Sequence, residues 1–153
     1  MTIQKSLRSR ALDILSRREV SRLELKRKLA PYAEAENEEE IDKVLEEFAD
    51  RNWQSDERYA EAYVYSKSRK YGSLRLLHDL SAKGVERELI QAHLPDREQE
   101  LANACAVLRK KFPSPADNPK DKQKQARFLA YRGFSTDTAY RAMQTAWHEE
   151  ENS

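Results

Sequence analysis

Two stretches of the chain end in the same way, roughly fifty residues apart, which is a spacing typical of structural repeats. Residues 80–85 and 129–134 share a leucine, a basic residue, a glycine and an apolar residue at matching positions. A glycine just past the last helical turn takes the left-handed conformation, and the apolar residue after it packs against the leucine. The pattern therefore predicts two helices with the same capped ending, and positive φ at Gly84 and Gly133.

A third, degenerate copy of this ending lies near the start of the chain. Leu29 holds the leucine position there, but Pro31 replaces the glycine as the residue that stops the helix. The spacing of Leu29, Leu80 and Leu129 favours a repeat of about 50 residues. The alternative, that unrelated helices merely share common cap chemistry, stays open on this pattern alone.

The remaining pattern is helical. The chain of 153 residues contains only three glycines and five prolines, which favours long helices over many-turned β structure. Apolar residues recur at three- and four-residue spacing in nine segments, which fall into triplets spanning residues 6–53, 55–94 and 96–148. We therefore expect an all-α fold in which three tandem three-helix repeats stack into an elongated, curved body.

Capping residues mark most of the expected helix starts. Serine, asparagine and aspartate accept hydrogen bonds from the first free backbone amides of a helix. The predicted caps are Ser21 with Glu24, Asn37 with Glu40, Ser55, Ser73, Asp96 with Gln99, and Ser135. Gly72, between two of these helices, is expected to be an ordinary turn residue.

Catalytic and metal-binding patterns are absent from the sequence. The three histidines, His78, His93 and His148, lie on different expected helices, without the spacing of a metal site. Cys105, the single cysteine, falls on an apolar helix face and is expected to be a buried structural thiol. No phosphate-binding loop or nucleophile motif occurs. We expect no enzyme activity, no cofactor and no metal.

The composition limits where the protein acts. A formal net charge of +1 gives no global field toward nucleic acid, so any such signal must come from local patches. The lone cysteine fits a reducing compartment. With no signal peptide and no apolar run long enough to cross a bilayer, we expect a cytoplasmic protein without a membrane partner.

Basic residues cluster around the second helix of each triplet. Cations in the last turn of a helix complement its dipole, so many of them have an ordinary structural explanation. Their recurrence with the repeat favours a surface that contacts a polyanion or an acidic protein. The candidate contacts are Arg27, Lys67, Arg69, Lys70, Arg75, Lys83, Lys124, Arg127 and Arg132.

At specific positions the chain resembles the RecX family, regulators of the bacterial RecA recombinase. The N-terminal positions are Ala11, Leu12, Ile14, Leu15, Arg17, Arg18, Ser21, Glu24, Leu25, Lys28 and Leu29. The central positions are residues 56–60, Arg69, Gly72, Leu76, Leu80 and residues 83–85, and a looser match covers residues 132–134. Pro31, where a glycine would continue the repeat, is the departure that bears on how the first two repeats meet.

This resemblance implies a three-repeat helical protein without catalysis, acting as a monomer. Its implied partners are RecA and the RecA–DNA filament, with single-stranded DNA as a further candidate. It implies modulation, mainly inhibition, of strand exchange, ATP hydrolysis and coprotease activity in DNA repair and the SOS response. A stand-alone helical DNA-binding module and a scaffold for an unrelated protein remain as alternatives.

Overall fold

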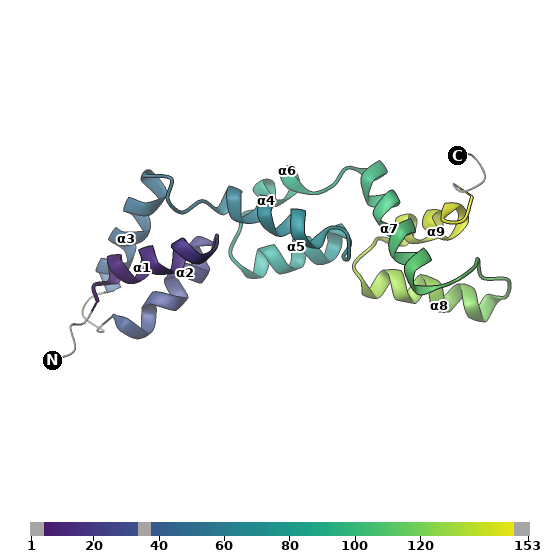
Figure 1. Cartoon of the computed structure of the whole chain (residues 1–153), viewed down its shortest axis with the longest axis horizontal. Coiled ribbons are helices and arrows are strands. Elements are labelled where there is room, and N and C mark those ends of the chain that lie inside the picture. Colours follow the sequence, from purple (N-terminus) through teal and green to yellow (C-terminus); the bar gives the residue numbers. More distant parts are fainter. Residues whose placement is uncertain (1–4, 34–37, 149–153) are drawn as a thin grey trace. The chain divides into compact units, whose positions relative to one another are not determined.

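The structure, a computed structural model, describes residues 5–33 and 38–148 and is helical throughout these ranges, with no strand in them (Figure 1). The helices are α1 (Leu7–Arg17), α2 (Arg22–Leu29), α3 (Glu38–Asp50), α4 (Asp56–Lys67), α5 (Ser73–Ala82), α6 (Arg87–His93), α7 (Arg97–Lys111), α8 (Pro119–Tyr131) and α9 (Thr136–Thr145). A short 3₁₀ turn, η1 (Ala30–Tyr32), extends α2 past Leu29. The predicted all-α fold is confirmed.

The two matched helix endings have the predicted geometry. Gly84 has φ of 80° and Gly133 has φ of 95°, which places both in the left-handed region. The Val85 amide donates to the Leu80 carbonyl at 3.1 Å, and the Phe134 amide donates to the Leu129 carbonyl at the same distance. These bonds satisfy carbonyls that a helix end leaves free. The glycine positions were thus predictable from the local sequence.

Most of the predicted N-caps are also confirmed. The Ser21 hydroxyl accepts from the Glu24 amide at 3.1 Å, and Ser55, Asp96 and Ser135 cap α4, α7 and α9 in the same way. Asn37, the residue predicted to cap α3, lies outside the described residues.

The predicted Ser73 cap is wrong. Ser73 is already the first residue of α5, and the carbonyl of Gly72 accepts the first amides of that helix. The Ser73 hydroxyl is buried and has no hydrogen-bond partner within the described part of the chain. Its backbone amide instead donates to the Glu100 carboxylate at 2.6 Å. Gly72 therefore holds the N-cap position and has no side chain to offer there, whereas Ser73 lies one residue too far along the helix to cap it.

The chain divides into two compact units, and the division runs through α4 and α5. Unit 1 comprises Met1–Ala62 with Leu80–Ile90, and unit 2 comprises Tyr63–Asp79 with Gln91–Ser153. Each unit has its own hydrophobic core.

The core of unit 1 is formed where α1, α2 and α3 pack together. Its fully buried members include Ala11, Leu25, Leu29 and Phe48. The Phe48 ring meets Trp53 edge to face, with 5.3 Å between the ring centroids. Three helices that each supply one apolar stripe can bury that stripe only against one another, which is what fixes this arrangement.

A bidentate ion pair joins α1 to α3 at the surface of unit 1. Arg8 donates from Nε and Nη2 to the Glu47 carboxylate at 3.0 Å, and its guanidinium lies 5.5 Å from the Trp53 ring centroid. The hydrogen bond from Arg8 holds the pKa of Glu47 below its usual value. The pair therefore links α1 to α3 at the surface, beside the contact between Phe48 and Trp53.

The core of unit 2 lies between α7, α8 and α9. Cys105, Leu108, Leu129 and Phe134 are its large, fully or almost fully buried members. The Cys105 sulfur lies 3.5 Å from the Thr145 hydroxyl. The predicted burial of this thiol is confirmed.

Gly72 is more than a turn residue, because two loops of unit 2 meet there backbone to backbone. The Gly72 amide donates to the Arg132 carbonyl at 2.9 Å, and the Leu74 amide donates to the Gly133 carbonyl at 3.1 Å. A Cβ built on Gly72 would lie 2.5 Å from the Phe134 nitrogen and closer still to the Gly133 carbonyl. Only a residue without a side chain allows this approach.

Candidate functional site

Most of the basic residues singled out in the sequence gather in unit 2. Arg69 and Lys70 follow α4, Arg75 lies on α5, and Arg132 ends α8. Lys124 and Arg127 project from the exposed face of α8. These cations lie on or beside helices whose other faces form the core, so their positions are set by packing.

The first groove, which we call the α7–α8 groove, has a volume of about 560 Å³. Its lining consists of Arg69, Lys70, Tyr71, Ala106, Val107, Lys110, Lys111, Phe128 and Arg132. Cations therefore line it from three segments of the chain, and the lining contains no carboxylate. Such a concave, one-signed surface focuses the field that attracts an anion.

Aromatic rings hold two of the guanidinium groups in place. The Arg75 guanidinium lies 4.1 Å from the centroid of the Tyr71 ring, and that of Arg132 lies 5.6 Å from the same ring. Arg132 also lies 5.2 Å from the Phe128 centroid and donates to the Lys70 carbonyl at 3.4 Å. Cation–π contacts leave the guanidinium edge free to donate, so Arg132 can still bind an anion. Arg75 is also paired with the Asp79 carboxylate at 3.8 Å.

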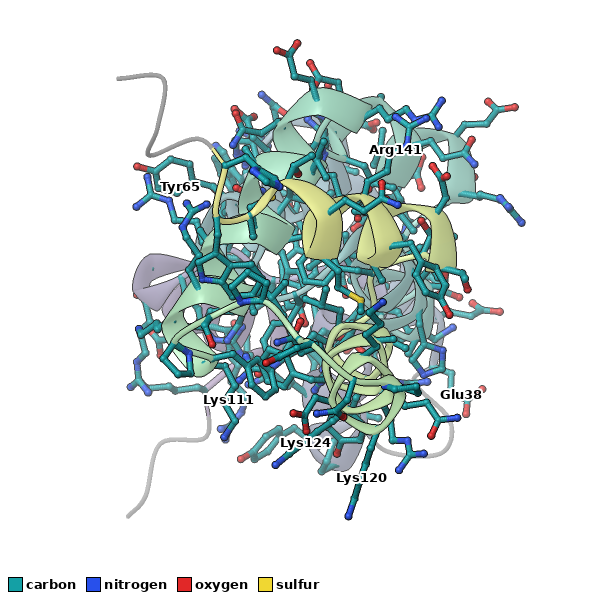
Figure 2. The ribbon with its side chains drawn as sticks, turned by 90° about the vertical axis from the view of Figure 1, so that its right-hand side faces the viewer. Glu38, Tyr65, Lys111, Lys120, Lys124 and Arg141 are labelled. Carbon is teal, nitrogen blue, oxygen red and sulfur yellow. The ribbon has the colours of Figure 1, made fainter. Side chains whose placement is uncertain are left out.

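The second groove, which we call the outer α8 groove, is larger, about 880 Å³. It is lined by Lys111, Phe112, Lys120, Asp121, Gln123, Lys124, Arg127, Phe128 and Tyr131. Figure 2 shows Lys111, Lys120 and Lys124 in the same part of the molecule. Because Lys111 and Phe128 line both grooves, the two form one continuous basic and aromatic surface.

The aromatic part of this surface is partly exposed. Phe112 and Phe128 meet edge to face, with centroids 5.6 Å apart, and both remain half-buried. Tyr131 leaves 80 % of its surface exposed. An exposed ring beside several cations is the combination that binds single-stranded nucleic acids, through base stacking and phosphate contacts.

Four predicted contacts line neither groove of unit 2. Lys67, at the end of α4, and Arg75, on α5, are absent from both linings. Arg27 and Lys83 belong to unit 1. Lys83 is paired with the Glu24 carboxylate at 3.6 Å, which reduces its value as a free contact. The structure thus does not bring these four into the grooves.

Sequence reasoning missed several members of this surface. Lys110 and Lys111 lie in the last turn of α7, where cations also complement the helix dipole. No charge pattern in the sequence marks the rings of Tyr71, Phe128 and Tyr131. One available signal was the four-residue spacing of Lys124, Phe128 and Arg132, which places all three on one helix face.

Two other kinds of site are not found among the described residues. No group of three or more histidine, cysteine or carboxylate side chains among them could hold a metal ion. Within the same residues, no helix is both long and apolar enough to cross a membrane. What the arrangement can do is bind an anionic surface.

Comparison with known proteins places the chain in a family. Models of the second and third three-helix domains of RecX match residues 55–94 and 98–143. The regulatory protein RecX of Neisseria gonorrhoeae strain FA 1090 is 63 % identical over 149 residues, covering 97 % of this chain and 96 % of the relative. The chain belongs to the RecX family.

More distant RecX proteins agree with this assignment. RecX of Chromobacterium violaceum is 44 % identical, covering 87 % of this chain and 86 % of its own. The crystal structure of RecX from Lactobacillus salivarius superimposes with a TM-score of 0.78 at 22 % identity, covering 92 % of this chain and 94 % of that one, which shows the shared fold. The relatives are named regulatory proteins, so the RecX name indicates a regulatory role.

Proposed function

We propose that this RecX chain binds the RecA–DNA filament and restrains RecA. It lowers the rates of strand exchange, ATP hydrolysis and coprotease action, and so acts in DNA repair and the SOS response. It works as a cytoplasmic monomer, through binding alone. Membership of the RecX family carries this proposal.

The grooves of unit 2 support the proposal physically. A filament of protein wound on DNA presents phosphates and acidic side chains over many subunits. The α7–α8 groove offers several cations on packed elements and no carboxylate in its lining. Each surface ion pair contributes only about 0.2–1 kcal/mol, so affinity must come from the sum of many contacts.

The test is a titration of RecA activity on single-stranded DNA. Wild-type protein is added to RecA while ATP hydrolysis and strand exchange are measured. We expect both rates to fall at concentrations comparable to that of RecA. If neither rate changes, the proposal is wrong.

A charge-reversal pair locates the surface. Arg69→Glu with Lys70→Glu changes two cations of the α7–α8 groove, and we expect the potency to fall about ten-fold or more, because attraction becomes repulsion. Lys43→Glu with Arg87→Glu makes the same charge change at exposed positions outside this groove. The control pair should retain wild-type potency. Equal potency of the two pairs would remove the α7–α8 groove from the proposal.

A further inference from the structure

Unit 1 contains a basic groove of its own, with a volume of about 560 Å³, which we call the α1–α2 groove. It is lined by Lys5, Arg10, Asp13, Ile14, Arg17, Arg18, Lys28, Pro31 and Tyr32. Of the candidate contacts chosen from the sequence, none lies in it. It therefore belongs to no site described so far.

The charge in this groove is strongly one-sided. Among the described residues that line it, the only carboxylate is that of Asp13, which accepts a hydrogen bond from Lys5 at 2.7 Å, and this bond holds the pKa of Asp13 below its usual value. The Arg10 guanidinium lies 3.7 Å from the Tyr32 ring centroid. No hydrogen bond or ion pair joins Arg17 or Lys28 to another described residue. Both cations thus line the groove without such a bond, and the charge of Arg17 also acts on the nearby Asp13 carboxylate.

The first helix of this groove corresponds to that of the α7–α8 groove. Ala11 of α1 and Ala104 of α7 are both fully buried, so they align the two helices. Ile14 and Val107 then share the position three residues later. The positions six and seven residues after the alanine carry Arg17 and Arg18 at the end of α1, and Lys110 and Lys111 at the end of α7. All of these later residues line their respective grooves.

The second helix gives the same result. Leu29 and Leu129, both fully buried, align the two endings. The position just before this leucine is Lys28 in one unit and Phe128 in the other, and both line the grooves. The position three residues after it holds Tyr32 and Arg132, which also line them. Two separate units therefore build a basic groove from the same positions of the repeat.

In the middle triplet, the positions that correspond to these groove residues bond to each other. Tyr63 holds the position of Ile14, and Asp79 holds that of Lys28. The Tyr63 hydroxyl donates to the Asp79 carboxylate at 2.9 Å and so joins the two helices. The same fold can therefore be built with the groove positions bridged, which means that the open grooves are not required for packing.

We propose that the α1–α2 groove is a second binding site, matched to the α7–α8 groove, and that both hold the backbone of single-stranded nucleic acid. Phosphates fit the cations, and exposed rings fit unstacked bases. Tyr32, in the α1–α2 groove, is 58 % exposed, and Tyr131, in the outer α8 groove that continues the α7–α8 groove, is 80 % exposed. An acidic peptide would satisfy the cations but would leave these rings unused. The inference rests on the proposed function, within which it names the DNA strand as the ligand.

The experiment measures fluorescence anisotropy of labelled oligothymidine with the full chain and without RecA. Three double reversals are compared. Arg17→Glu with Lys28→Glu alters the α1–α2 groove, Lys110→Glu with Lys111→Glu alters the α7–α8 groove, and Lys43→Glu with Arg87→Glu is the control. Thermal melting by circular dichroism confirms that each variant is folded.

We expect each groove reversal to weaken binding about ten-fold relative to the control. Each reversal should also reduce the slope of log affinity against log salt by about one for each phosphate that the variant no longer binds. If the α1–α2 reversal binds as tightly as the control, the second site is refuted. If polyglutamate competes as well as oligothymidine at equal charge, the ligand class is refuted.

The outcome separates this inference from the proposed function. A wild-type chain that slows RecA but does not bind oligothymidine would refute the inference and leave the proposed function standing. A chain that binds oligothymidine through both grooves but leaves RecA unaffected would support the inference and refute the proposed function. That second result would instead indicate a stand-alone DNA-binding module.

Discussion

Replacement of Gly72 by alanine tests the closest backbone contact in unit 2. The added Cβ would overlap the Gly133 carbonyl and would lie 2.5 Å from the Phe134 nitrogen. These are backbone atoms, held by the capped end of α8, so they cannot rotate away as a side chain can. The two loops must therefore separate.

The cost follows from what that separation breaks. Two hydrogen bonds are broken, from Gly72 to Arg132 and from Leu74 to Gly133, at about 1 kcal/mol each. Displacement of a well-packed backbone adds roughly 1–3 kcal/mol. We expect Gly72→Ala to lower the free energy of unfolding of unit 2 by about 3–5 kcal/mol in total, a large share of the 5–15 kcal/mol typical of a domain.

Gly84→Ala is the matched control, in unit 1. Its positive φ costs an alanine about 1–2 kcal/mol. Its Cβ would meet the Cβ of Leu23 at 2.8 Å and the Cδ2 of Leu23 at 2.9 Å, but it would meet no backbone atom as closely and break no hydrogen bond between loops. We therefore expect the Gly72 variant to be the more destabilised, although the sequence alone suggests the opposite order.

Urea unfolding followed by tryptophan fluorescence measures each unit separately. Trp53 belongs to unit 1 and Trp147 to unit 2, so a Trp53→Phe background reports unit 2 alone and a Trp147→Phe background reports unit 1. A free energy of unfolding for Gly72→Ala that lies within about 0.5 kcal/mol of the parent value would refute the backbone contact.

Three further predictions concern single side chains. Ser21→Ala should cost about 1 kcal/mol of unfolding free energy because it removes a helix cap, whereas Ser73→Ala should be neutral or stabilising because its buried hydroxyl has no partner; urea midpoints compare them. Arg8→Met should raise the pKa of Glu47 toward its ordinary value, which an NMR titration would measure. In the wild type, the stability that this pair contributes is present above the pKa of Glu47 in the unfolded chain. It is lost as the pH falls through the lower pKa of Glu47 in the folded chain. Leu129→Ala should cost about 2–5 kcal/mol by leaving a core cavity, which calorimetry would detect as a lower Tm.

The parts of the fold that the sequence predicts are those set by neighbouring residues. The capped endings at Gly84 and Gly133 depend on six consecutive residues, so a local pattern is sufficient. Gly72 was misjudged because its constraint comes from Gly133, which is distant in sequence. Ser73 was misjudged for a similar reason: its amide is bound by Glu100, and the cap is supplied by the residue before it.

The candidate site was partly predictable for the same reason. The cations of the α7–α8 groove stand out as basic runs, so Arg69, Lys70 and Arg132 were identified. The rings beside them carry no such signal, because an aromatic residue on a helix face is more often part of a core. The ion pair of Lys83 could not be predicted from its neighbours, because its partner, Glu24, lies on α2.

Equivalent positions of the three triplets distinguish cations that complement a helix dipole from cations that line a groove. Seven residues after the buried alanine, every triplet has a cation, namely Arg18, Lys67 and Lys111. A cation at the end of a helix complements its dipole, which accounts for this position without a ligand.

The preceding position differs, with Arg17 and Lys110 in the outer triplets but Ser66 in the middle one. Helix α4 continues to Lys67 with that serine, so the helix does not require a cation there. In the middle triplet the groove is also bridged, by the bond from Tyr63 to Asp79. The cation at this position therefore occurs only where the groove is open, which is the pattern expected of a residue that contacts a ligand.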